Sequence, residues 1–429
     1  MNDKPSNSPL EQRLIDHIAK YGPITFEAFM DAALYDPEHG YYPSKRREAP
    51  ISPVGTSGDY FTSPTSHPAF GALIALQLEE MWRTLGSPTE FTVVEMGAGV
   101  GVLQSDITEY VERELPPFSK AMRYIATDVA PPPESESVAK STALPVGVAG
   151  CVLSNELLDA MPVNRFIVQN GVVREIFVDF QGDEFVEMVG DVSEPEVAAR
   201  VEPFLSSLPE GYRGEVNLRL GYWVDSVSAT LDRGYVLTLD YGFDRPELYK
   251  PTRVDGSLRC YYQHTLGQNP LRRIGRQDIT AHVDFTAVDH GMMVMGIERI
   301  GKLTQQQLLI NLGIDDFLQD VTLLDARNEI THTEAQENSA GIASLASTEG
   351  FGGFRVAVHA RGAGLYGEPL RALTGIDGGL RLTEGHAVPL LSDASAEHAR
   401  LLRSSNPFSS GDPSLAGLPT WEELFSDEP

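Results

Sequence analysis

One acid and three glycines alternate along a short stretch of the chain, at Glu95, Gly97, Gly99 and Gly101. An apolar run at 91–94 precedes them, which predicts a buried parallel strand that leads through a glycine turn into a helix from about Leu103. Glycines are needed where a backbone bends sharply and approaches a ligand closely. The free N–H groups at the start of such a helix are suited to bind a carboxylate or a phosphate.

The acid in front of the glycines distinguishes between ligands. A dinucleotide-binding fingerprint has the spacing G-x-G-x-x-G, and a carboxylate beside it would repel the pyrophosphate. S-adenosylmethionine carries an ammonium group and a sulfonium but no phosphate, so an acidic loop suits this cofactor better. A Rossmann dehydrogenase and a plain tight turn of an α/β protein are the alternatives.

Residues on both sides of the glycine loop are candidates for further cofactor contacts. The next predicted strand ends at Asp128, and an acid in that position binds ribose hydroxyls in nucleoside-binding sheets. A turn aspartate at a strand end is the alternative. Before the loop, a polar and aromatic segment precedes a predicted helix at 68–85, and its Tyr60, Thr62 and Ser63 are predicted to fold over the cofactor. A simple helix cap is the alternative for that segment.

A second group of polar residues follows the predicted strand 150–154. Asn155, Glu156 and Asp159 come at the carboxyl end of this strand, the edge at which open α/β sheets bind ligands. A structural cap would need only one polar side chain there. Asn155 offers a neutral contact to the cofactor, whereas Glu156 and Asp159 are suited to hold a guanidinium or ammonium group.

Polar and aromatic residues gather again between 256 and 284, a composition typical of the wall of a site. Within it, His282 is the candidate proton acceptor, together with Asp278 or Asp284. A structural histidine whose hydrogen bonds are satisfied within the fold is the alternative.

The composition bounds the class of protein. The 429 residues are enough for two or three domains, and a net charge of −28 argues against nucleic acid and anionic membrane as partners. The charge is compatible with a cationic substrate or simply with solubility. Two cysteines predict no disulfide framework and no metal site, and no apolar run of about 18 residues predicts membrane insertion. The first residues lack a targeting pattern, which predicts a cytoplasmic protein.

The chain is predicted to form three parts. Residues 1–88 form a helical N-terminal segment and cofactor lid, and residues 89–362 form a Rossmann-like domain with insertions at about 164–214, as β-hairpins, and 256–290. Residues 363–429 are acidic and rich in Gly, Ser and Pro, which predicts a flexible tail that folding and cofactor binding do not need. Other predicted elements are a helix at 215–231, a strand at 293–300 and a polar, partly mobile segment at 328–350.

Six sequence blocks occur together and in order: 40–42, 58–64, 95–101, 155–162, 239–242 and 278–285. Together they resemble the MidA family, whose mitochondrial members are complex I assembly arginine methyltransferases. The resemblance extends over roughly residues 10 to 362. Its blocks at 155–162 and 278–285 are more specific than the glycine loop.

The resemblance implies a Rossmann-like class I methyltransferase fold with a seven-stranded sheet, inserted β-hairpins and S-adenosylmethionine as cofactor. It also implies symmetric dimethylation of an arginine on a core complex I subunit, so the expected partner is a protein with an exposed arginine. A non-catalytic assembly scaffold and a small-molecule methyltransferase are the alternatives. The oligomeric state stays open, with a homodimer as one option.

Overall fold

The computed structural model describes most of the chain, and it divides the chain into two units. Unit 1 comprises Met1–Pro50, Leu158–Trp223 and Gly242–Val288, and unit 2 comprises Ile51–Leu157, Val224–Tyr241 and Asp289–Pro429. Tyr60 lies outside the described residues. The described residues are 7–47, 62–129, 138–140, 144–263, 265–267, 269–363, 370–374, 386–394 and 398.

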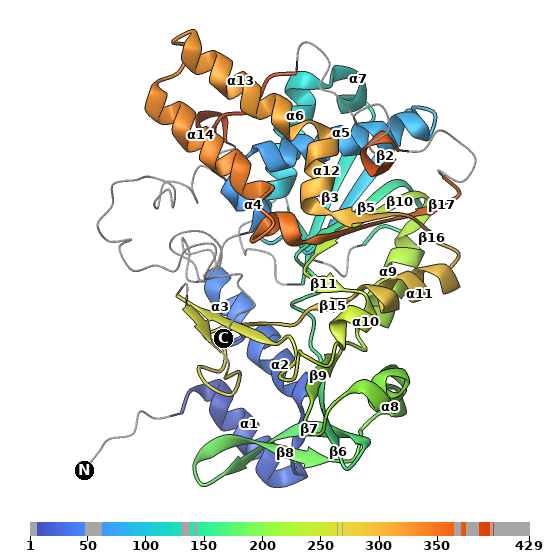
Figure 1. Cartoon of the computed structure of the whole chain (residues 1–429), viewed down its shortest axis with the longest axis vertical. Coiled ribbons are helices and arrows are strands. Elements are labelled where there is room, and N and C mark those ends of the chain that lie inside the picture. Colours follow the sequence, from blue (N-terminus) through green and yellow to red (C-terminus); the bar gives the residue numbers. More distant parts are fainter. Residues whose placement is uncertain are drawn as a thin grey trace. The chain divides into compact units, whose positions relative to one another are not determined.

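Unit 2 is built on a seven-stranded sheet with the order β16-β17-β10-β5-β2-β3-β4 (Figure 1). From β10 to β4 the neighbouring strands are parallel, while β17 is antiparallel to both of its neighbours. The chain runs outward from β2 to β4 and then returns on the other side of β2 as β5. Open sheets bind ligands at such a reversal, outside the carboxyl ends of the strands. The strands are β2 Phe91–Met96, β3 Met122–Asp128, β4 Val138–Lys140, β5 Val148–Asn155, β10 Leu231–Asp240, β16 Glu298–Thr304 and β17 Arg355–Arg361.

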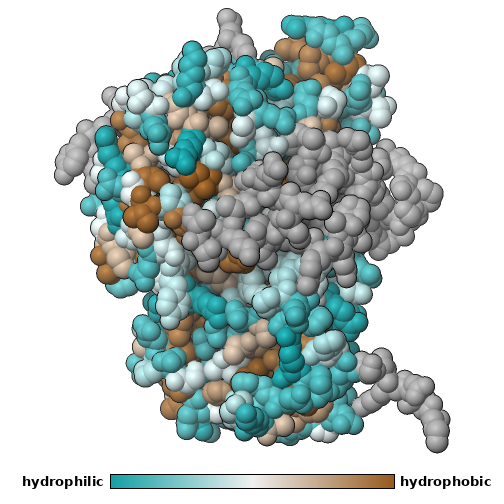
Figure 2. Space-filling model, turned by 180° about the vertical axis from the view of Figure 1, so that it is seen from behind, coloured by the Kyte–Doolittle hydropathy of each residue, from teal (hydrophilic) through white to brown (hydrophobic). Residues whose placement is uncertain are grey.

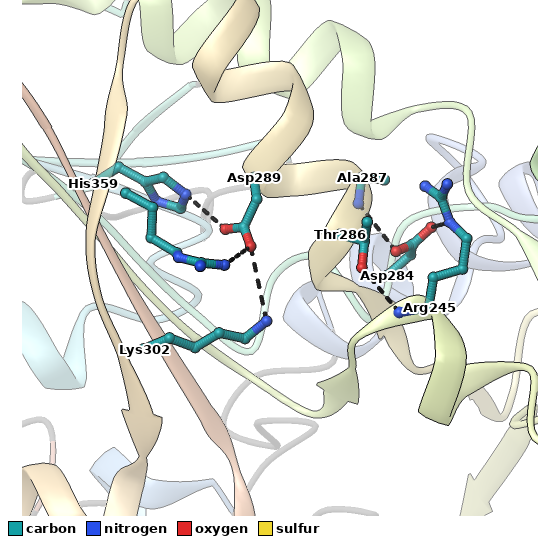
Figure 3. Close-up of polar contacts among 8 residues, drawn as sticks. Arg245, Asp284, Thr286, Ala287, Asp289, Lys302 and His359 are labelled. Atoms are coloured by element: carbon teal, nitrogen blue, oxygen red, sulfur yellow. Dashed lines mark hydrogen bonds and ion pairs between the residues drawn. The ribbon is translucent and has the colours of Figure 1, made fainter.

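Alternate residues of the strands face opposite sides of this sheet, and β17 shows the pattern. Val356 and Val358 join the main apolar core with helices α5, α6 and α12 (Ala69–Thr84, Val102–Glu114 and Gln305–Leu312). On the other face, His359 Nε2 lies 2.9 Å from Oδ1 of Asp289 in α11 (Phe285–Val294), and Asp289 also pairs with Lys302 (Figure 3). The sheet is therefore covered by helices on both faces, as a parallel sheet requires.

Unit 1 contains the inserted β-hairpins. Its five-stranded sheet has the order β1-β7-β6-β9, with β8 paired to β7. The turn between β6 and β7 is Asn170-Gly171, and both residues have positive φ, as two-residue hairpin turns prefer. The predicted α/β fold with inserted hairpins is confirmed. The elements are β1 Ile24–Thr25, β6 Asn164–Gln169, β7 Val172–Gln181, β8 Glu184–Gly190, β9 Arg213–Val216, and the helices α1 Pro9–Tyr21 and α2 Phe26–Tyr35.

Three of the predicted elements differ from the structure. The expected helix 215–231 begins only at Leu220, because residues 213–216 pair with β6 as strand β9. The strand expected at 293–300 begins at Glu298, because α11 continues to Val294. The polar segment 328–350 contains helix α14, His332–Leu345, whose first turn is fixed by a capping box of Thr331 and Glu334.

The predicted division into three consecutive parts also differs from the observed units. The N-terminal segment is shared, since residues up to 50 belong to unit 1 and later ones to unit 2. In the tail, Leu370, Val388 and His398 are buried within unit 2. Composition predicted flexibility there because the short apolar groups that contain Leu370 and Val388 are outnumbered by Gly, Ser and acidic residues when the whole tail is averaged.

The described surface carries hydrophobic side chains in separate places. Figure 2 shows one face, on which hydrophilic residues predominate and hydrophobic ones form several separate groups. The large apolar side chains with the highest exposure are Tyr222, Val146, Tyr21 and Val294. Within the described ranges, no helix combines the length and apolar character needed to cross a membrane.

Candidate active site

The glycine loop has a backbone that only glycine adopts without strain. Gly97, Gly99 and Gly101 have φ angles of 81°, 59° and 85°, and Gly101 precedes helix α6. The N–H of Gly97 donates to the carbonyl of Thr127 in β3 at 2.8 Å. A Cβ on Gly97 would lie 2.7 Å from Leu157 Cδ1, whereas one on Gly99 would meet no described atom within 4 Å. The predicted strand, glycine turn and helix are therefore present, with room beside Gly99.

Glu95 is a buried acid at the end of β2. Its Oε2 accepts a hydrogen bond from the Tyr124 hydroxyl at 2.9 Å. The pKa of Glu95 is raised to about 7, chiefly by burial and also by the charge of Asp128, while the hydrogen bond from Tyr124 acts in the opposite direction. An ammonium group beside Glu95 would stabilise its ionised form. The sequence did not single out Tyr124, because its place beside Glu95 depends on the register between β2 and β3.

Asp128 and Asn155 end the two strands on either side of β2. Asp128 Oδ2 accepts a hydrogen bond from the Gly99 N–H at 3.0 Å, which places this acid at the loop. Asn155 Oδ1 is buried and accepts no hydrogen bond from any residue that the structure describes. Buried acceptors are normally satisfied, so Asn155 suits a ligand N–H donor. Acids, glycines and an unsatisfied acceptor at the strand-order reversal fit S-adenosylmethionine.

Glu156 has an unusual backbone conformation at the end of β5. Its φ is 49°, in the left-handed region that non-glycine residues rarely occupy. Its N–H donates to the carbonyl of Leu239 in β10 at 2.9 Å, and the next N–H, of Leu157, donates to Asp240 Oδ2 at 3.1 Å. These bonds fix the strained turn. Strain that the surrounding structure maintains is a feature of functional sites.

Three hydrogen-bond donors converge on the Glu156 carboxyl group. Oε1 accepts from the Ser63 N–H at 3.2 Å and from Asn155 Nδ2 at 3.1 Å, and Oε2 accepts from the Tyr241 hydroxyl at 3.0 Å. The pKa of Glu156 is raised to about 8, chiefly by burial and also by the charge of Asp240, while these three hydrogen bonds lower it. Thr62, by contrast, caps the short helix α4, Ser63–Ser66, through Thr65. Tyr241 was missed as a site residue, although its block of the sequence was noted.

The remaining predicted site residues belong to unit 1. Asp159 accepts a hydrogen bond from the Ala281 N–H through its backbone carbonyl at 2.9 Å, and Asp278 accepts one from the Tyr42 hydroxyl at 2.9 Å. Because Glu156 belongs to unit 2, the predicted clamp of Glu156 and Asp159 joins residues of two units and stays a prediction.

Asp284 anchors the start of α11. Its Oδ1 accepts from the Ala287 N–H at 3.0 Å, and its Oδ2 accepts from Arg245 Nε at 2.8 Å (Figure 3). The N–H of Arg245, in helix α10 (Arg245–Leu248), also donates to Thr286. These contacts describe a residue that positions α11, and a role in proton transfer stays untested.

His282 follows β14 (Asp278–Thr280) and precedes β15 (Val283–Asp284). Burial lowers its pKa to about 3, and the charges of Arg253 and Arg259 act in the same direction. The ring is therefore neutral near pH 7 and lies 5.3 Å from that of Phe243, centroid to centroid. Its Nδ1 is buried and has no hydrogen-bond partner in the described part of the chain.

A mostly parallel seven-stranded sheet and an acidic glycine loop at the strand-order reversal define a Rossmann-like class I methyltransferase. Residues 73–301 match a family of S-adenosyl-L-methionine-dependent methyltransferases, and the chain belongs to this family. The predicted fold, family and cofactor are thus confirmed.

Relatives and a solved structure resemble the chain over most of its length. The protein arginine methyltransferase NDUFAF7 homolog of Drosophila melanogaster, a mitochondrial protein, is 27% identical over 320 residues, 66% of this chain and 69% of that protein. The mitochondrial protein arginine methyltransferase NDUFAF7 of Homo sapiens is 27% identical over 359 residues, 75% of this chain and 77% of that protein. A Burkholderia thailandensis protein solved with bound S-adenosyl-homocysteine has a TM-score of 0.72 and 28% identity, with 85% of this chain and 98% of that chain covered.

The predicted cytoplasmic location is wrong on this comparison, because the relatives are mitochondrial proteins. The prediction rested on the residue pattern of the first few positions. Such a pattern can indicate a targeting segment, but it says nothing about the compartment in which the related proteins are found.

Proposed function

We propose that the protein transfers a methyl group from S-adenosylmethionine to an arginine of another protein. The observation that carries this proposal is Glu156, a strained acid at the carboxyl end of β5 with three donors on its carboxyl group. An arginine is cationic at any physiological pH, so a site for it needs a carboxylate that holds the guanidinium. The names of the relatives, protein arginine methyltransferases, support the same acceptor.

The cofactor supplies the methyl group, and the protein binds and orients both reactants. We assign Glu95 to the ammonium group of the cofactor, Asp128 to its ribose hydroxyls and Asn155 Oδ1 to an N–H donor, with the glycine loop allowing close approach. The guanidinium binds Glu156, stabilises its ionised form and lowers its pKa from about 8. Alignment of the nucleophilic nitrogen with the methyl group is the main contribution of such a site.

The unit 1 residues extend this proposal. Asp159 is the proposed second carboxylate for the guanidinium. His282 is proposed as part of the wall, since a neutral imidazole does not repel a cationic substrate and a pKa of about 3 disfavours proton uptake at neutral pH. Asp278 and Asp284 are proposed to position the segment that carries His282.

The family resemblance supports a subunit of respiratory complex I, or a related protein, as the acceptor. Incubation of a lysate with methyl-labelled S-adenosylmethionine, followed by identification of the labelled band, tests this part of the proposal. Light scattering on the same preparation tests whether the protein is a homodimer.

Glu156→Gln tests the assignment of the acid, because it keeps the shape and removes the charge. Removal of one partner of a desolvated charge pair costs about 2–5 kcal/mol, roughly 30- to 5,000-fold. We expect methylarginine formation, measured by mass spectrometry, to fall by that factor, while cofactor affinity in calorimetry changes by only a few-fold. The control is Glu80→Gln, a change at another buried glutamate of unit 2 with a raised pKa.

The possible outcomes distinguish between different roles of Glu156 and between different functions of the protein. Wild-type turnover in Glu156→Gln would remove Glu156 from the mechanism, and loss of cofactor binding would move it to the cofactor site. A wild-type protein that labels no protein band would favour a small-molecule acceptor or a non-catalytic scaffold.

A further inference from the structure

A histidine from the C-terminal tail is buried in unit 2, where it contacts residues of α6 and α4. His398 has no exposed surface, and its Nδ1 lies 2.7 Å from Asp106 Oδ2 while its Nε2 lies 3.2 Å from the carbonyl oxygen of Thr65. The other oxygen of Asp106 is buried and accepts no hydrogen bond from the described residues. His398 is thus the one described side chain that hydrogen-bonds the Asp106 carboxyl group.

The two elements that His398 joins both lead to the site. Asp106 lies on α6, the helix that begins at the glycine loop, and Thr65 lies on α4, whose Ser63 N–H donates to Glu156 Oε1. On α5, a Cβ at Gly71 would be 2.6 Å from the Cβ of Asp106, so α6 is packed too closely there for Asp106 to move toward α5. Asp106 therefore offers a fixed point to which His398 ties α4.

A second tail contact acts at His67, the residue that follows α4. The Leu391 N–H donates to Asn338 Oδ1 at 2.8 Å, and the same oxygen lies 3.1 Å from Nε2 of His67. Burial lowers the pKa of His67 to about 3, so the ring is neutral; its Nδ1 accepts from the Ala69 N–H, and its Nε2 therefore donates to Asn338. The tail thus restrains α4 at Thr65 directly and at His67 through Asn338.

We propose that His398 is a positioning residue for methyl transfer, through which the tail holds α4 so that Ser63 donates to Glu156. This inference rests on the proposed function only for the role of Glu156; the restraint of α4 stands independently. Removal of the restraint frees the Ser63 N–H from the Glu156 carboxylate. Loss of one hydrogen bond to a charged group corresponds to roughly 10- to 100-fold in the rate constant.

The test compares His398→Phe with His386→Phe in the full-length chain. His386 lies in the same tail, and its buried Nδ1 has no partner among the described residues, which makes it a matched control. Because His398→Phe leaves Asp106 buried without its partner, the double variant Asp106→Asn with His398→Phe is measured alongside. The readouts are hydrogen exchange of peptides covering 62–70, the Kd for S-adenosyl-homocysteine, the Tm, and kcat/KM for the labelled acceptor.

We expect faster exchange at 62–70 and a roughly 10- to 100-fold lower kcat/KM in both His398 variants, with S-adenosyl-homocysteine affinity within about threefold of wild type. His386→Phe should match wild type. Unchanged exchange at 62–70, or faster exchange spread over all of unit 2, would overturn the proposal, as would an affinity loss equal to the loss in kcat/KM. If the wild type labels no acceptor, the proposed function fails while exchange still decides whether His398 restrains α4.

Discussion

Tyr241→Phe removes the hydrogen bond from the Tyr241 hydroxyl to Glu156 and keeps the aromatic ring. The Tyr241 hydroxyl donates to Glu156 Oε2 at 3.0 Å, and the ring packs edge-on against Phe354 with centroids 4.2 Å apart. Phenylalanine keeps this ring contact, so the variant is expected to fold. We therefore expect the substitution to change mainly the pKa of Glu156.

The size of the effect follows from the strength of the lost bond. A hydrogen bond to a charged group contributes about 1.5–3 kcal/mol, and about 1.4 kcal/mol corresponds to one pKa unit. The pKa of Glu156 is raised to about 8 in the wild type, and loss of a donor to the ionised form raises it by roughly one to two units more. At pH 8 the ionised fraction of Glu156 in the protein without acceptor then falls from about half to about a tenth or less, which lowers kcat/KM at least about fivefold.

The pH dependence of methyl transfer distinguishes this cause from a general loss of structure. In its proposed role Glu156 binds the acceptor as a carboxylate, and kcat/KM reports the pKa of the protein before the acceptor binds. We therefore expect kcat/KM to rise with pH through about 8 in the wild type and through a higher midpoint in Tyr241→Phe. The two rates should approach each other at the highest pH. Tyr110→Phe is the control, since the Tyr110 hydroxyl is buried without a partner among the described residues. An unchanged midpoint in Tyr241→Phe would refute the reasoning.

Two further predictions concern the loop and the tail. Gly97→Ala places a Cβ on a residue with a φ of 81° and 2.7 Å from Leu157 Cδ1. It should destabilise the protein by more than the roughly 1–2 kcal/mol that the backbone strain alone costs. It should also weaken S-adenosyl-homocysteine binding. Urea unfolding and calorimetry measure both effects, and wild-type values would contradict the geometry of the loop. Truncation after Ala363 removes the buried Leu370 and Val388, at about 1.5–3 kcal/mol each, and should lower the Tm; an unchanged Tm would show that the tail does not dock.

The parts of the site that lie within one stretch of chain were predictable from sequence. The alternation of Glu95 with three glycines after an apolar run dictates a strand, a sharp turn and a helix, and the structure has all three. Asn155 and Glu156 were likewise expected at a strand end because the apolar run before them stops there. The spacing of residues within such a stretch predicts its strand, turn or helix, because these elements depend on backbone geometry over a few residues.

The partners of the two buried acids were not predictable in the same way. Tyr124 reaches Glu95 only through the register of β2 and β3, and Tyr241 reaches Glu156 only because β10 and β5 end together. The left-handed turn at Glu156 depends on the Leu239 carbonyl, 83 residues away. His398 is the extreme case, because a single anchor residue in a polar tail has no periodicity from which to predict burial.

The raised pKa of Glu95 links cofactor binding to stability. In the unfolded chain this group titrates near 4.5, whereas burial raises its pKa to about 7 in the folded protein. The free protein should therefore lose about 3 kcal/mol of stability between pH 4.5 and 7, since the unfolded state gives up this proton first.

A bound ammonium group should reverse that loss, because it pairs with the ionised form. The affinity for S-adenosyl-homocysteine should then rise about tenfold per pH unit up to pH 7 and level off above it. In the wild type, the ligand-induced increase in Tm should follow the same course from pH 5.5 to 8.5. In Glu95→Gln, this increase should hardly depend on pH. Subtracting the increase in Glu95→Gln from that in the wild type removes the contribution of the other acids. An equal ligand-induced increase at pH 5.5 and 7.5 in the wild type would show that no cation of the ligand pairs with Glu95.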